Sequence, residues 1–221
     1  RPAAGLVVCR FATTFDGGST WQIGGPLPLQ KKNSSCDQPL AAAALQGNFY
    51  LAYKDLYFLG PNSSGVVDVL VARSTNGGAT FPNYSKAVSH GSNSKKIYNQ
   101  IYPVKAYLGV DNSAASPYQG TLYLGFTDEN AEPDPRVLVV ISRDGGFHWS
   151  NPEVAAEPTG IDVDELYQDN ALPVVGPDGS AYLFFSEWKS EDSTEGPMSI
   201  RLAKSTDGGA SWHPQPDVAT N

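Results

Sequence analysis

A turn motif that is written four times constrains the fold of this chain more than any other feature of its sequence. The copies occupy residues 14–21, 74–81, 142–149 and 205–212. Each begins with Ser or Thr, has Asp or Asn third, continues with two glycines and closes on Trp or Phe. The first glycines lie 60, 68 and 63 residues apart. That period is too long for a helical solenoid and somewhat longer than a WD40 blade.

The chemistry of the motif predicts a β-hairpin turn at each copy. An Asp-Gly or Asn-Gly pair between apolar runs is the strongest short-range hairpin signal, because the turn needs positive φ angles. The Ser or Thr hydroxyl and the carboxylate can bond local backbone amides. The closing aromatic ring can then pack over the turn. We therefore interpret the motif as a folding device rather than a functional site.

The four copies resemble the Asp-box (BNR) repeat of the sialidase-like β-propeller superfamily, and the resemblance covers nearly the whole chain. It implies an all-β propeller of four-stranded antiparallel blades, with structural Asp-box hairpins. We expect one partial propeller over residues 1–221 with about three and a half blades. Their expected bounds are approximately 1–30 (a half blade), 37–90, 98–156 and 166–221.

Each later unit predicts an inner strand, a Tyr-rich second strand, an aliphatic third strand and a fourth strand after the turn. Before the first turn we expect a strand over 6–11, and after it a connection over 22–36. A closed propeller typically has four to eight blades. The chain is then either a portion of a longer propeller or a compact four-bladed ring closed by the tail 213–221. That tail, with two prolines, looks too short for closure.

Composition narrows the environment and the partners. A net charge of −8 argues against nucleic acid and anionic membranes as partners, and no apolar run could span a bilayer. Cys9 and Cys36 fit one disulfide in an oxidising compartment, or two buried free thiols. The chain begins Arg1-Pro2 without Met, which suggests a removed leader. We expect a secreted, cell-surface or periplasmic protein.

Alternating strand directions should gather polar residues on the face opposite the hairpins. Inner-strand starts would place there Asp37, Gln38, Asn99, Gln100, Gln168, Asp169 and Asn170. Second-strand ends would add Lys54, Asp55, Asp128, Glu129, Glu187, Trp188 and Lys189, and a third strand opens with Arg136. An acid therefore recurs at the end of all three second strands.

Carboxylates, amides and aromatics in such a ring are what a sugar site uses, since glycoside hydrolysis needs two carboxyls. The candidate catalytic residues are Asp37, Asp128 and Glu187. The candidate substrate-binding residues are Asp55, Gln100, Glu129, Arg136, Asp169 and Trp188. For any single residue, the alternative is an ordinary solvated turn.

Three functions stay open at this stage. The first is a glycan-binding or glycoside-hydrolysing propeller with a carbohydrate or glycoconjugate partner. The second is a non-catalytic scaffold for protein interaction or assembly. The third is an exo-sialidase: the resemblance implies three arginines that clamp the substrate carboxylate, and only Arg136 is well placed. In each case, remaining blades or another chain would close the ring.

No cofactor is expected. The acidic run 162–165 suggests Ca²⁺ but lacks the EF-hand loop pattern. His90, His148 and His213 lack metal-ligand spacing.

Overall fold

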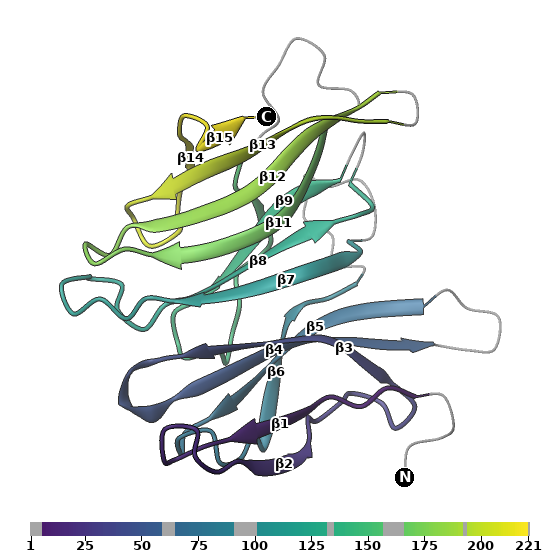
Figure 1. Ribbon diagram of the computed structural model, residues 1–221, viewed down its shortest axis with the longest axis vertical. Coiled ribbons are helices and arrows are strands. Elements are labelled where there is room, and N and C mark those ends of the chain that lie inside the picture. The colour runs from purple at the N-terminus through teal and green to yellow at the C-terminus, as the bar shows by residue number, and fades with distance from the viewer. Residues whose placement is uncertain are drawn as a thin grey trace.

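The computed structural model describes residues 6–58, 65–90, 101–131, 135–156, 166–191 and 194–220, and these residues form four antiparallel sheets. The helical structure within these ranges is one short 3₁₀ turn, Leu45–Gly47. Figure 1 shows the sheets as successive layers along the molecule. The expected all-β class, with antiparallel blades, is confirmed.

The first sheet has two strands and the next two have four each. The first pairs β1 (Arg10–Thr13) with β2 (Gln22–Pro26). The second contains β3 (Ser35–Ala43), β4 (Phe49–Phe58), β5 (Gly65–Ser74) and β6 (Asn83–Val88). The third contains β7 (Pro103–Val110), β8 (Leu122–Asp128), β9 (Arg136–Ser142) and β10 (Glu153–Val154).

The fourth sheet has five strands, and its last two come from the C-terminal tail. It contains β11 (Leu166–Val175), β12 (Ala181–Glu191), β13 (Thr194–Ser205), β14 (His213–Pro214) and β15 (Ala219–Thr220). Both β14 and β15 pair with β13, so the described tail extends its own sheet. The ring closure considered for this tail, by pairing in the first sheet, is therefore not what the structure shows.

The sheets pack face to face through apolar layers. Side chains alternate between the two sides of a strand, so each central sheet feeds two layers. Between the second and third sheets lie Val69, Val71, Leu122, Leu124 and Phe126, each at most 1% exposed. Between the third and fourth lie Val137, Val139, Ala171, Leu183 and Phe185. Burial of such a side chain stabilises the fold by about 1.5–3 kcal/mol.

The third and fourth sheets approach so closely that one contact requires glycine. A Cβ atom at Gly125 of β8 would lie 2.2 Å from the carbonyl oxygen of Ala171 in β11. The inner strands β3, β7 and β11 lie next to one another in this order, and β7 contacts both of the others (Figure 1).

The four repeated hairpins (residues 14–21, 74–81, 142–149 and 205–212) share one hydrogen-bond pattern. In each, the N–H of the second glycine donates to the first residue's hydroxyl, at 2.8 Å in Gly18–Thr14 and in Gly209–Ser205. The corresponding distances are 3.0 Å to Ser74 and 2.9 Å to Ser142. All eight motif glycines have positive φ. The prediction of four hairpin turns is confirmed.

Hydrogen bonds inside these hairpins lower the pKa of their carboxyls. The Ser211 hydroxyl and its backbone N–H lower the pKa of Asp207 to about 2. The Thr20 hydroxyl and N–H do the same for Asp16, also to about 2. Burial alone would raise the pKa of Asp144, but bonds from His148, Ser142 and Phe147 outweigh it and lower that pKa.

The expectation of a strandless connection over 22–36 is wrong. Residues Gln22–Pro26 form β2, and β3 begins at Ser35. Pairing explains the difference: β2 bonds along β1, and the Leu27 N–H continues the contact with the Cys9 carbonyl at 2.9 Å. Strand formation depends on such pairing more than on intrinsic propensity.

Cys9 and Cys36 form a disulfide, with their Cα atoms 5.5 Å apart. Of the two alternatives for these cysteines, the structure has the bonded one. The crosslink ties the segment before β1 to β3 across 27 residues. Closing a loop of this length stabilises a fold by about 3–4 kcal/mol on the chain-entropy estimate. Within the described ranges, no helix has the length and apolarity to cross a membrane.

Candidate functional site

The three inner strands share an irregularity that sets up the candidate site. Register shifts occur between Asp37 and Leu40 in β3, between Val104 and Tyr107 in β7, and between Asp169 and Leu172 in β11. Each bulge contains one non-glycine residue with positive φ: Gln38 (49°), Lys105 (48°) and Asn170 (60°). We call these three residues the bulge row.

Left-handed backbone at non-glycine residues is uncommon and strained, and it concentrates at functional sites. Bulges also re-aim side chains next to active sites. Here the same device recurs at one level of three neighbouring strands. The bulge row is therefore a structural feature repeated in three sheets rather than an isolated irregularity.

Polar contacts join the bulge row across the three sheets. The Lys105 N–H donates to Gln38 Oε1 at 3.1 Å. The Lys105 ammonium forms an ion pair with the Asp169 carboxylate, and the Tyr107 hydroxyl donates to Asn170 Oδ1 at 3.4 Å. One polar chain thus runs from β3 through β7 to β11.

In the Lys105–Asp169 ion pair, the aspartate is nearly buried and the lysine is partly exposed. Asp169 is 8% exposed and also accepts bonds from the Thr127 hydroxyl (2.7 Å) and the Asn170 N–H (2.8 Å). The Lys105 side chain keeps 41% of its surface exposed. Beside it, Asp37 pairs with Lys54 at 3.4 Å and stays 63% exposed.

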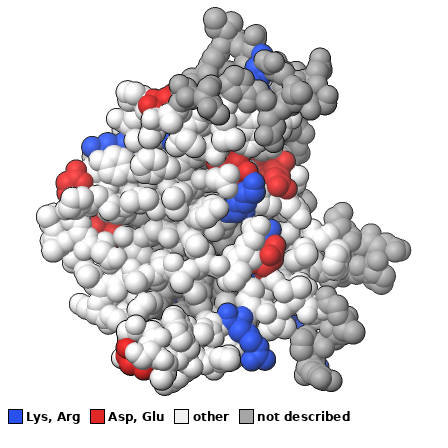
Figure 2. Space-filling view, viewed as in Figure 1, with Lys and Arg blue, Asp and Glu red and all other residues white. Residues whose placement is uncertain are grey.

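A hollow of approximately 330 Å³ opens at this level. Its lining comprises Gln38, Pro39, Leu40, Lys105, Ala106, Tyr107 and Asn170. Amide, ammonium and phenol groups converge there beside small apolar surfaces, which is the composition of a site for a small polar ligand. Figure 2 shows a mostly uncharged face, near the middle of which acidic and basic side chains lie next to one another in small groups.

A second row, the acid row, consists of Asp55, Asp128 and Glu187. The three occupy equivalent register positions, opposite Cys36, Pro103 and Gln168 of the inner strands. They are 0%, 0% and 5% exposed, respectively. The recurrence of an acid at second-strand ends is thus structural equivalence, but these acids lie buried rather than at the surface.

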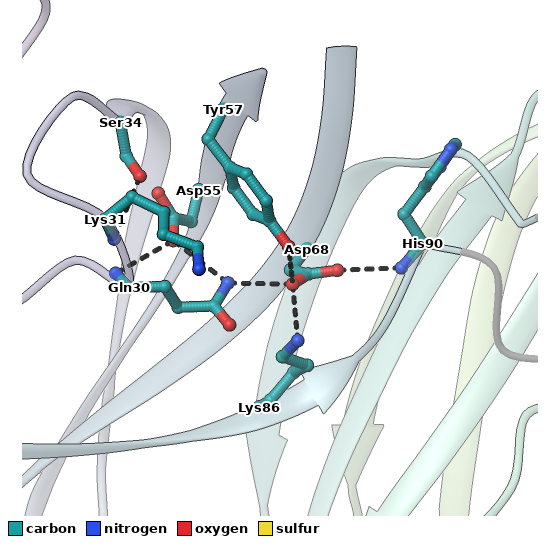
Figure 3. Close-up of polar contacts among 8 residues, drawn as sticks. All are labelled: Gln30, Lys31, Ser34, Asp55, Tyr57, Asp68, Lys86 and His90. Atoms are coloured by element: carbon teal, nitrogen blue, oxygen red, sulfur yellow. Dashed lines mark hydrogen bonds and ion pairs between the residues drawn. The ribbon is translucent and has the colours of Figure 1, made fainter. Parts of the chain in front are cut away.

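In the second sheet, Asp55 belongs to a buried polar cluster through its Oδ2, while its Oδ1 has no hydrogen-bond partner in the described structure (Figure 3). Gln30 Nε2 donates to Asp55 Oδ2 at 3.0 Å and to Asp68 Oδ2 at 2.7 Å. The Gln30 N–H adds a bond of 3.0 Å to Asp55. A single glutamine therefore bridges two buried carboxylates.

Within this cluster, Asp68 forms an ion pair with a lysine. Lys86 Nζ lies 2.7 Å from Asp68 Oδ2, while the Tyr57 hydroxyl (3.3 Å) and the His90 N–H (2.8 Å) also donate to it. Lys31 lies over the Tyr57 ring, 5.9 Å from its centroid (Figure 3). Because its donors satisfy Asp68 from several sides, the cluster supports the sheet internally.

Asp128, in the third sheet, is bonded by two backbone N–H groups, and one of its carboxylate oxygens has no partner among the described residues. Its Oδ1 accepts the N–H groups of Tyr102 (2.9 Å) and Asn130 (3.1 Å). Its Oδ2 is buried without a hydrogen-bond partner in the described structure. Burial raises the pKa of Asp128, against smaller opposing effects of these bonds and of His90. A buried acid with a raised pKa is a candidate proton donor.

Glu187, in the fourth sheet, is compensated. It forms an ion pair with Arg201 and accepts a bond from Gln168 Nε2 at 2.9 Å. Arg201 also pairs with Asp217 at 2.7 Å. This acid is therefore committed to a buried network.

The other predicted site residues are dispersed. Glu129 is exposed after β8, and Arg136 lies opposite Asp128 in the strand register. Trp188 stacks on Tyr167, with ring centroids 5.9 Å apart, on the side of β12 opposite Glu187. Gln100 and the acidic run 162–165 lie outside the described residues. No cluster of three or more metal-binding side chains occurs in the part that the structure describes.

Lys105 and Tyr107 are the site residues that the sequence analysis missed. The inner strand of the third unit was expected to start at Asn99 and Gln100, whereas β7 begins at Pro103 and Val104 occupies the position of Asp37. The apolar–polar alternation over residues 104–108 was the available signal. Gln30 and Asp68 were missed because side-chain partners distant in sequence define them.

Comparisons with known proteins identify the fold and no closer relationship. No protein-family model matches the chain, and no curated protein does. Among solved structures, a Hadza microbial sialidase aligns with a TM-score of 0.61 at 15% identity, over 100% of this chain and 47% of its own. An α-L-arabinanase of Penicillium chrysogenum, complexed with arabinobiose, aligns with a TM-score of 0.63 at 12% identity, over 96% and 60% respectively.

A sialidase of Trypanosoma rangeli in complex with sialic acid gives a TM-score of 0.55 at 16% identity, over 97% of this chain and 34% of its own. Likeness at such identities shows the fold alone, which is the β-propeller fold of sialidases and arabinan-degrading enzymes. The chain spans between about a third and three fifths of these structures.

Proposed function

We propose that this chain forms part of an exported β-propeller that binds or hydrolyses glycans through the face opposite its four repeated hairpins. The observation that carries the proposal is the bulge row with its hollow of approximately 330 Å³. The Cys9–Cys36 disulfide supports an oxidising compartment.

The repeated hairpins are, in this proposal, Asp-boxes that organise the blades. Their hydroxyls and carboxylates bond to their own turns, as in Ser205 and Asp207, so little of that chemistry is left for a ligand. The blades correspond approximately to residues 1–30 (a half blade), 37–90, 98–156 and 166–221.

The bulge row supplies sugar recognition. Gln38 and Asn170 offer amides, Lys105 an ammonium and Tyr107 a phenol, and sugar hydroxyls both donate to and accept from such groups. The two carboxyls that hydrolysis requires are Asp37 and Asp169, since both border the bulge row and Asp37 is 63% exposed. Asp128 has a raised pKa, but it is 0% exposed and does not line the hollow, so a sugar bound there does not reach it.

A neutral sugar fits the described residues better than sialic acid does. Two arginines are engaged elsewhere: Arg201 with Glu187, and Arg143 Nη2 with the Gly208 carbonyl at 2.7 Å. The net charge of −8 also opposes an anionic substrate. The exo-sialidase function would therefore need arginines contributed by further blades.

The test is a substrate panel with the purified protein. We expect binding of arabinobiose by titration calorimetry, or release of p-nitrophenol from an α-L-arabinofuranoside, with weaker or no response to sialyllactose. Loss of p-nitrophenol release in Asp37→Asn, with arabinobiose binding retained, would assign Asp37 a catalytic role. A protein that neither binds nor cleaves any member of a broad neutral-glycan panel would contradict the proposal.

A scaffold that assembles through its sheet faces is the second candidate. The outer side of the fourth sheet leaves Leu172 and Val174 43% exposed and Met198 42% exposed, and Ile23 in the first sheet is 78% exposed. Further blades or another chain would cover such surfaces. Sedimentation analysis of wild type and Val174→Glu tests this: concentration-dependent assembly that the substitution abolishes supports it, and a monomer at all concentrations contradicts self-assembly.

A further inference from the structure

On the hairpin side, a small pocket lies between the second and third sheets and belongs to neither row described above. It has a volume of approximately 140 Å³ and lies between β6 and the third repeated hairpin. Its lining comprises Val71, Arg73, Thr75, Pro82, Asn83, Tyr84, Ser85, Gly146 and Phe147. Arg73, at the end of β5, lies opposite Asn83 in the register.

The guanidinium of Arg73 is held in place by its neighbours, but no acidic side chain in the described part of the chain forms an ion pair with it. Its guanidinium lies over the Phe147 ring, with the Cζ atom 5.0 Å from the ring centroid. The Nε atom is buried and has no hydrogen-bond partner among described residues. A Cβ atom at Gly145 would lie 3.3 Å from Arg73 Nη1, so the bare glycine makes room for the guanidinium.

The neighbouring sheet junctions use their polar groups internally. Thr13, which precedes the first hairpin as Arg73 precedes the second, donates its hydroxyl to the Gly78 carbonyl at 2.6 Å. At the following junction Ile141 holds the position of Arg73, and Arg143, within the hairpin, donates from Nη2 to the Gly208 carbonyl at 2.7 Å. Arg73 therefore retains hydrogen-bonding capacity that the residues at the other two junctions use within the fold.

The pocket also offers aromatic surface. Phe147 of the third repeated hairpin is 63% exposed. Trp149 Nε1 donates to Ser85 Oγ at 2.9 Å and so fixes the position of the third hairpin against β6. Because guanidinium matches carboxylate geometry and an aromatic wall suits a sugar ring, the lining fits one carboxylated sugar residue rather than a long chain.

We propose that this pocket is a secondary binding site for a carboxylated pyranose, with Arg73 as the carboxylate-binding residue, Phe147 as the aromatic wall, and the Asn83 amide as a hydroxyl ligand. This site lies at the hairpin ends of the strands, so it is independent of the glycan function proposed for the bulge row.

The test is a titration of isotopically labelled protein with sodium glucuronate, N-acetylneuraminate and glucose, followed by backbone amide shifts. We expect glucuronate or N-acetylneuraminate to shift the amides of Arg73, Asn83 and Phe147, and neutral glucose to bind at least about tenfold more weakly. Which of the two acids binds more tightly identifies the sugar. Equal binding of glucose, or no binding of either acid, would overturn the proposal.

Variants make the assignment specific. Arg73→Gln should weaken binding at least about tenfold, and Arg73→Lys by less, because it keeps the charge but loses the bidentate geometry. Phe147→Ala should weaken binding, whereas Phe15→Ala is the matched control, since Phe15 is 60% exposed on the first hairpin. Lys105→Met should leave this binding unchanged. Wild-type affinity in a folded Arg73→Gln protein would refute the role of Arg73.

Discussion

The two ends of the blade strands are built on opposite principles. At the hairpin end, four turns repeat the same interactions of a hydroxyl, a carboxylate (a carboxamide in the second turn) and two glycines, with bonds from the second glycine of 2.8–3.0 Å. At the other end, the acid row places Asp55, Asp128 and Glu187 in equivalent positions but gives each different partners. The interactions at the hairpin end are the same in every sheet, whereas those at the other end differ from sheet to sheet.

This difference separates scaffold from function. A hydrogen-bond pattern that is identical in every sheet stabilises the repeating unit and cannot distinguish one sheet from another. Different side chains at equivalent backbone positions can form a specific binding site, as Lys105 does between Gln38 and Asn170. The most specific chemistry is therefore expected where the repeat breaks down.

The acid row gives the largest expected contrast. Glu187→Gln should lower the free energy of unfolding by about 3 kcal/mol, because it leaves the buried Arg201 without its strongest partner. Asp128→Asn at the equivalent position should raise it by about 1 kcal/mol at pH 7, because it removes a buried charge and keeps the oxygen that accepts the Tyr102 N–H. Urea denaturation of both variants measures the difference. Equal destabilisation would show that the two acids have the same role.

The bulge row should respond in binding rather than in fold. Lys105→Met should reduce glycan affinity by about tenfold to a hundredfold, since it removes the exposed donor of the hollow. Lys204→Met is the matched control, because Lys204 lies over the Tyr182 ring in the fourth sheet, 5.3 Å from its centroid. Calorimetric titration compares them, and an equal loss in both variants would argue against the bulge row.

The hydroxyl groups that begin the hairpins should affect stability alone, to a degree set by their burial. Ser205→Ala should lower the free energy of unfolding by about 2 kcal/mol, because Ser205 is 0% exposed and bonds both Asp207 and Gly209. Thr14→Ala removes the same bonds from an exposed turn, so it should cost about half as much or less. Thermal and urea unfolding test this. A loss of glycan binding in a folded Ser205→Ala protein would contradict the scaffold role.

The smallest effect should appear in acid. The pKa of Asp207 is about 2 in the folded state, below its ordinary value of 3.8, so its ionised form favours folding. Its contribution is complete above about pH 4 and is lost as the pH falls through 4 towards 2. Ser211→Ala, which removes the largest cause of the shift, should flatten the stability profile in that range. An unchanged slope in the variant would contradict this assignment.

The sequence predicted the uniform end of the structure well and the individual end poorly. The hairpins were predictable because each motif contains its own partners within eight residues, from Ser205 to Trp212 for example. A third strand was also predicted to open at Arg136, and β9 begins there.

Long-range contacts account for the rest. β2 forms because β1 pairs with it, and Lys105 matters because Asp169 lies 64 residues further along the chain. The acids of the second strands were correctly recognised as equivalent, but their burial depends on the next sheet. Periodicity within one strand does not reveal what packs against it.

The most direct test of the central claim is a crystal structure of the protein with arabinobiose. We predict that the sugar lies among the bulges of β3, β7 and β11, within hydrogen-bonding distance of Lys105 and of Gln38 or Asn170. A disaccharide bound instead against the repeated hairpins or the outer side of the fourth sheet, with the bulge row empty, would contradict the account.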